Sequence, residues 1–157
     1  FSSAYYIAAG VGCLAAGYLS RRLVVLGWSV HGARLATFAA CVALTATSLA
    51  AAYLPASPLL LGLLLAIGFG SLGQFPPYYA FTQEISARRM GLVTGLFSLA
   101  AWGATAPIHP AIGLWIDQTG SYAIPNALAG LAPVVALLAL VALWDDPRRF
   151  WRSSRSS

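Results

Sequence analysis

Long stretches without a charged side chain constrain this chain more than any other feature of its sequence. No Asp, Glu, Lys or Arg occurs in three stretches, 35–83, 90–116 and 118–144. The hydrocarbon core of a bilayer is about 30 Å thick, and roughly 20 apolar residues cross it as a helix. The first stretch is therefore long enough for two crossings, and each of the other two is long enough for one. The charge-free run 4–20, ahead of Arg21, adds a fifth crossing.

The scarcity of charge also excludes an ordinary water-soluble domain. Only 8% of the 157 residues are charged and 59% are hydrophobic, whereas about a quarter of the residues of a soluble domain carry a charge. Helices are the expected element, because an open strand edge in lipid leaves backbone groups unpaired. We predict an all-α fold, a polytopic membrane helix bundle over residues 1–144 with a basic tail at 145–157. The predicted spans are 4–20, 35–54, 58–82, 91–115 and 125–144.

These five spans place every basic residue on one side of the membrane. The second and fourth loops hold none, while the first and third loops and the tail hold all nine: Arg21, Arg22, Arg34, Arg88, Arg89, Arg148, Arg149, Arg152 and Arg155. Basic loops tend to stay in the cytoplasm. We therefore expect a multi-pass plasma-membrane protein, in a bacterium the inner membrane, with a cytoplasmic C-terminus. Phe1 would then lie outside, which implies at least one earlier span.

Two of the charge-free spans carry a polar face, with residues recurring at steps of three and four. The third span has Ser71, Gln74, Tyr78 and Thr82, and the fourth has Thr94, Ser98, Trp102, Thr105 and His109. Lipid penalises such faces, so both should point at other helices or at a water-filled cavity. Ser71, Thr94 and Thr105 suit polar contacts between helices, whereas the larger Gln74, Tyr78 and Trp102 favour a cavity. A weaker series in the second span suits close packing: Thr37, Cys41, Thr45 and Ser48.

Prolines indicate where two spans can be interrupted. Pro76 and Pro77 have no amide donor, so helix carbonyls beside Gln74 lose their backbone partners. Pro107 and Pro110 have the same effect beside the second polar face. Neighbours or water must satisfy such carbonyls in a membrane. In transporters these breaks tend to lie near the substrate.

Two further residues have simple structural interpretations. His109 is a candidate proton carrier, but between two prolines its ring can equally bond a freed carbonyl. Glu84 precedes Arg88 by four residues, which predicts an ion pair along the helix.

Enzyme signatures are absent from the sequence. It contains no H-E-x-x-H, no G-x-S-x-G and no Walker loop, so we do not expect an enzyme. With two histidines and two scattered cysteines, neither a metal site nor another cofactor is expected. The basic tail fits anionic lipid headgroups, and no nucleic-acid recognition fold is visible.

Several motifs resemble those of a known family. Residues 17–22, Gly-Tyr-Leu-Ser-Arg-Arg, resemble the G-x-L-[SA]-D-R loop signature of the major facilitator superfamily, with Arg21 in the place of Asp. The continuation through Gly27-Trp28-Ser29 to Ala33-Arg34 is similar to the organic anion:cation symporter branch. So are residues 91–98, and then Pro110, Gly113 and 117–121. The loop motif thus comprises Gly17, Arg21, Arg22 and Arg34.

This resemblance implies helices eight to twelve of a transporter's C-terminal half. It implies a secondary active transporter working by alternating access, with a small solute such as an organic anion or sugar acid as substrate. A coupling proton or cation, the lipid bilayer and the missing N-terminal half would be its partners. Tyr78 and Ser98 replace the Trp and Asn that the branch often carries. The candidates for the substrate path are Gln74, Tyr78, Ser98, Trp102, Ser71 and His109.

A second hypothesis comes from a different class of protein. In a non-transporting membrane sensor or assembly subunit, the same polar faces would only join helices to one another. The sequence leaves both hypotheses open.

Overall fold

The computed structural model describes residues 2–51, 53–85 and 89–143, and every regular element among them is a helix. The predicted all-α membrane bundle is confirmed, with five helical segments long and apolar enough to cross a bilayer. The elements are α1 (Ser2–Val25), α2 (Val30–Ala46), α3 (Ser48–Ala51), α4 (Pro58–Gly73), α5 (Phe75–Ile85), α6 (Met90–Thr105), α7 (Ile108–Thr119) and α8 (Ala123–Leu143).

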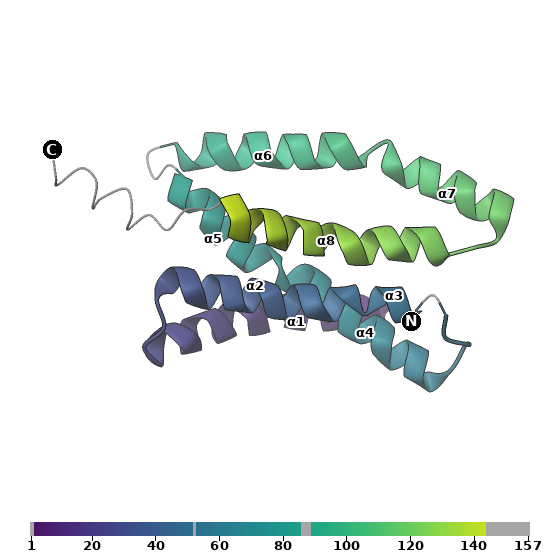
Figure 1. Ribbon diagram of the computed structural model, residues 1–157, viewed down its shortest axis with the longest axis horizontal. Helices are drawn as coiled ribbons and strands as arrows, with labels where there is room; N and C mark the ends of the chain where they lie inside the picture. Colours follow the sequence, from purple (N-terminus) through teal and green to yellow (C-terminus); the bar gives the residue numbers. More distant parts are fainter. Residues whose placement is uncertain (1, 52, 86–88, 144–157) are drawn as a thin grey trace, which may run out of the picture.

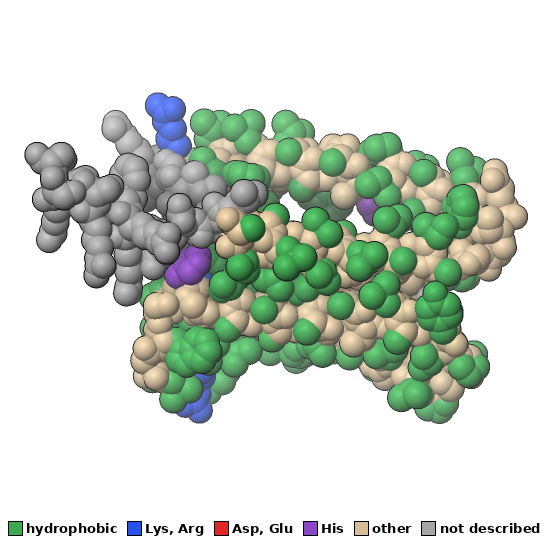
Figure 2. Space-filling view, in the orientation of Figure 1, with side chains coloured by type: hydrophobic (Ala, Val, Ile, Leu, Met, Phe, Trp, Pro, Cys, Tyr) green, Lys and Arg blue, Asp and Glu red, His purple; other side chains and the backbone are tan. Residues whose placement is uncertain are grey.

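The long helices run roughly along one axis in two groups (Figure 1). Helices α1, α2 and α4 pack on one another, and α8 lies on α2 and α3. Helices α6 and α7 form the outer edge of the molecule and contact the rest mainly through α5. No described residue of α6 or α7 is buried, and the molecule is visibly hollowed between these helices and α8 (Figure 2).

Three spans begin or end several residues beyond the bounds that the sequence predicted, for identifiable reasons. The first, Ser3–Val25, continues through its arginines because they lie at the helix end, where Arg22 Nε donates to the Tyr18 hydroxyl at 2.8 Å. The second starts at Val30 because Ser29 caps it, accepting the Gly32 amide at 3.0 Å. The fourth extends to Thr119, so Asp117 lies in its last turn and not in a loop. Gly120 ends it with a left-handed φ of 64°.

Close contact between helices α1, α2 and α4 depends on glycines. A Cβ at Gly12 of α1 would collide with the backbone of Phe69, and one at Gly70 of α4 would lie 2.8 Å from the Cys41 carbonyl. The small residues expected to pack in the second span are indeed buried, each at most 5% exposed: Thr37, Cys41, Thr45 and Ser48. The apolar exterior that surrounds this contact (Figure 2) suits lipid.

The arginines of the described residues gather at one end of the bundle. Arg22 is in the last turn of α1, Arg34 is near the start of α2, and Arg89 immediately precedes α6. These helix ends lie together in Figure 1, and the α3–α4 and α7–α8 connections lie at the opposite end. The predicted Glu84–Arg88 pair and the basic tail fall outside the described residues.

Candidate functional site

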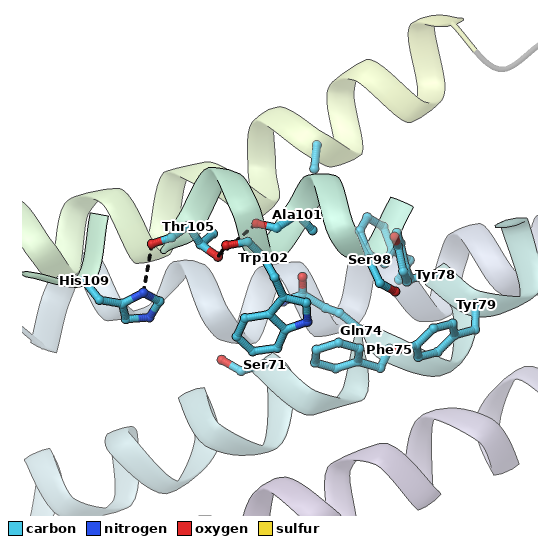
Figure 3. A pocket seen from close by; sticks show the side chains of 12 residues that line it. Ser71, Gln74, Phe75, Tyr78, Tyr79, Ser98, Ala101, Trp102, Thr105 and His109 are labelled. Carbon is cyan, nitrogen blue, oxygen red and sulfur yellow. Dashed lines mark hydrogen bonds between the residues drawn. The ribbon is translucent and has the colours of Figure 1, made fainter. Parts of the chain in front are cut away.

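A cavity of about 450 Å³ lies between the α4–α5 segment and the α6–α7 segment. All six candidates for the substrate path line it, although they come from two spans that are far apart in sequence (Figure 3). The described residues that line the cavity are Phe38, Ser71, Gln74, Phe75, Tyr78, Tyr79, Ser98, Ala101, Trp102, Thr105, His109 and Ala136.

Both spans are interrupted where they meet the cavity. Helix α4 ends at Gly73 and α5 begins at Phe75, and α6 ends at Thr105 before α7 begins at Ile108. The predicted proline breaks are therefore confirmed. Each break leaves part of the helical ladder unmade, and both breaks open toward the same space.

Gln74 occupies the first break. Its backbone N–H donates to the Leu72 carbonyl, which closes the last turn of α4. Its side-chain Nε2 donates to Thr45 Oγ1 of α2 at 2.8 Å. Gln74 thus joins two helices as well as lining the cavity, so both roles that the sequence left open for such a residue occur at one position.

Aromatic side chains form much of the cavity wall. The rings of Phe75 and Tyr79 are stacked 6.1 Å apart at 29° between their planes, and Tyr78 meets Tyr79 edge-on at 5.3 Å. From α6, Trp102 points toward the side that carries Ser71, Gln74 and Phe75 (Figure 3). These are the geometries that aromatic pairs prefer, and they leave flat surfaces for a ligand.

His109 lies at the second break, at the end of the cavity opposite Tyr78 and Tyr79 (Figure 3). Its Nδ1 is 2.9 Å from the Thr105 carbonyl oxygen, which closes α6. A carbonyl can only accept, so Nδ1 carries the proton. The ring thus bonds a backbone carbonyl at the break, as expected, but this carbonyl belongs to Thr105 and is not one of the two that Pro107 and Pro110 leave without an amide partner. The bond leaves Nε2 as the other polar atom of the ring.

Several polar candidates lie away from the cavity. Thr82 is buried and donates to the Tyr79 carbonyl at 2.8 Å, and Thr94 does not reach the lining. None of the four residues of the loop motif lines the cavity, because they lie on or near the α1–α2 turn at the end of the bundle: Gly17, Arg21, Arg22 and Arg34.

Sequence reasoning missed some of the lining. Phe38, Phe75, Tyr79, Ala101 and Ala136 are apolar or aromatic and carry no signal that separates a cavity wall from a packed core. The four-residue spacing of Phe75 and Tyr79 could have indicated a stacked pair.

None of the described residues that line the cavity is Asp, Glu, Lys or Arg. Within the described part of the chain, no three His, Cys, Asp or Glu side chains come together as a metal site requires. These lining residues can therefore bind a ligand through hydrogen bonds and aromatic stacking.

Comparison of the chain with known protein families, with curated proteins and with solved structures finds no match. The functional proposal therefore rests on the cavity and its lining.

Proposed function

We propose that this chain is part of a secondary active transporter that moves a small organic solute across the plasma membrane by alternating access. The cavity between α4–α5 and α6–α7 forms one wall of the solute path. One observation carries this proposal: polar and aromatic residues from two interrupted spans line a single cavity in an otherwise apolar bundle.

The cost of polar groups in lipid supports a wet or ligand-filled space. Gln74, Tyr78 and Trp102 each carry a strong hydrogen-bonding group, and such groups inside membranes mark substrate pathways. The cavity volume of about 450 Å³ lies within the roughly 300–1,000 Å³ of small-molecule sites. Two helix faces that only pack against each other would not leave a cavity of that volume between them.

The breaks in the two spans could allow α6 and α7 to move relative to the rest of the bundle. Helices α6 and α7 have no buried residue and are tied to the bundle mainly through α5. A segment held this lightly can rock against α1, α2 and α4 while the breaks at 74 and 106–107 absorb the change in backbone angle. Such rocking would open the cavity to each side in turn.

The resemblance to the major facilitator superfamily adds the rest of the proposal. The missing N-terminal half would pack against the exposed side of α6 and α7, where Gly91, Gly95 and Gly103 face open space. That half would supply any charged group needed for an organic anion or a coupling proton, because the part of the lining that the structure describes carries none. The arginine-bearing end of the bundle would face the cytoplasm.

Uptake by the full-length protein in proteoliposomes tests the proposal. Organic anions of two kinds, hexuronates and 4-hydroxybenzoate, are offered with an inward proton gradient, and wild-type protein is expected to accumulate at least one of them. Gln74→Ala and Tyr78→Ala should each lower uptake about tenfold, the effect of losing roughly 1.4 kcal/mol of binding. Tyr53→Ala serves as the control, because Tyr53 is 82% exposed and lies outside the cavity. Normal uptake by both cavity variants would contradict the proposed path.

A further inference from the structure

Thr45 of α2 has one hydroxyl proton and two hydrogen-bonding neighbours. Its Oγ1 lies 3.0 Å from the Cys41 carbonyl oxygen and 2.8 Å from Gln74 Nε2. The carbonyl can only accept, so the hydroxyl proton goes to Cys41, and a lone pair of Oγ1 remains for Gln74. The Gln74 atom that faces Thr45 must then be the donor of the amide, which is Nε2.

The surroundings of Thr45 hold this arrangement in place. Thr45 is 4% exposed, and α4 approaches it closely because Gly70 has no side chain. A Cβ at Gly70 would lie 3.0 Å from Thr45 Oγ1 and 2.8 Å from the Cys41 carbonyl. Neither water nor another donor therefore replaces Gln74 easily at this hydroxyl.

We propose that Thr45 is a positioning residue that fixes the Gln74 amide with its Oε1 turned to the cavity, so that the cavity binds the O–H or N–H donor of a flat, uncharged ring. This inference rests on the proposed function in taking the cavity as a binding site. It adds the chemistry of the group that is bound, and it names a residue outside the lining that sets the specificity.

The second break of the cavity offers the same chemistry. His109 donates from Nδ1 to the Thr105 carbonyl, so Nε2 of the neutral ring is an acceptor. Two acceptors of fixed orientation thus belong to the two breaks, Gln74 Oε1 at one and His109 Nε2 at the other. A ligand that lacks a donor would leave them unpaired, which selects strongly against it.

The shape and charge of the lining indicate a flat, neutral ring. Phe75, Tyr79 and Trp102 provide ring faces for stacking. No Asp, Glu, Lys or Arg is among the described residues of the lining, so these residues offer a charged group of the solute no partner. The ring of the solute would therefore contact this chain, and any charge would point away from it.

Binding of two matched probes tests this inference. Tritiated 4-methylphenol and 4-methylanisole differ only in the replacement of the phenolic O–H by a methyl ether, and the ether has no hydrogen-bond donor. Their binding to the full-length protein in nanodiscs is measured by scintillation proximity, with no transport required. Three variants are compared with wild type: Thr45→Val, Thr45→Ser and Thr37→Val. Thr37 is the matched control, because it is also buried in α2 and donates to a carbonyl four residues earlier, at 2.8 Å.

We expect wild type to bind the hydroxy compound about tenfold more tightly than the methoxy compound, consistent with the loss of one hydrogen bond. Thr45→Val should remove this preference by weakening only the hydroxy compound, whereas Thr45→Ser and Thr37→Val should retain it. The inference is overturned if neither probe binds, if wild type does not discriminate, or if Thr45→Val and Thr37→Val behave alike. Discrimination by a protein that shows no uptake would count against the proposed function alone.

Discussion

Gln74 and Thr45 are joined by a 2.8 Å hydrogen bond from the side-chain amide to the hydroxyl, and this bond connects the cavity to the tightly packed part of the bundle. Thr45 belongs to the buried face of α2, and Gln74 lies at the break between α4 and α5. The rigid group α1, α2 and α4 therefore holds one wall of the cavity in a fixed position. The opposite wall, on α6 and α7, has no comparable support.

The close packing of α1 on α4 can be tested with two glycines of the same helix. Gly12→Ala should destabilise the protein by about 1–3 kcal/mol, as overpacking does, because the new Cβ meets the Phe69 backbone. Gly10→Ala should not, since nothing lies within 4 Å of a Cβ there. Thermal unfolding in detergent measures both. Equal stability of the two variants would mean that α1 and α4 do not approach as described.

His109 should matter as a hydrogen-bond donor at the end of α6. His109→Phe leaves the Thr105 carbonyl without its side-chain donor and should cost about 1 kcal/mol of stability. In His109→Asn the side-chain amide nitrogen can take the place of Nδ1, so stability should be retained, while the loss of Nε2 should weaken solute binding. If His109→Asn abolished the proton dependence of uptake but left stability and solute binding as in wild type, His109 would instead be the proton carrier.

The orientation in the membrane can be tested with two serines that have the same local role. Ser29 and Ser57 each cap a helix by accepting an amide from three residues later, and they lie at opposite ends of the bundle. In intact cells an impermeant thiol reagent should label Ser57→Cys and leave Ser29→Cys unlabelled until the cells are opened. The reverse pattern would place the arginines outside.

Much of the fold could be predicted from the sequence, because each membrane-crossing helix requires a long stretch without charged residues. Charge-free stretches identified all five spans, and Pro76, Pro77, Pro107 and Pro110 identified both breaks. The ends of spans were less accurate, since Arg22 can extend from a helix end to the interface and Ser29 starts a helix earlier than hydropathy indicates.

The site was predicted only in part, for a physical reason. Polar residues on apolar helices are conspicuous, so Ser71, Gln74 and Ser98 stood out, and they do line one cavity. Thr45 was assigned to packing alone, because its bond to Gln74 joins residues 29 apart in sequence. The spacing of polar residues along one helix does not show which residue of another helix they contact.

The central claim is that the polar faces of two spans border a water-accessible solute path. Substituted-cysteine labelling tests it most directly, in protein with Cys13 and Cys41 replaced by alanine. Ser98 lines the cavity, whereas its neighbour Leu99 lies outside the lining and is 70% exposed. With a small hydrophilic thiol reagent, we predict that Ser98→Cys reacts and that Leu99→Cys, which lies outside the solute path, does not. Unreactive Ser98→Cys beside reactive Leu99→Cys would contradict the account.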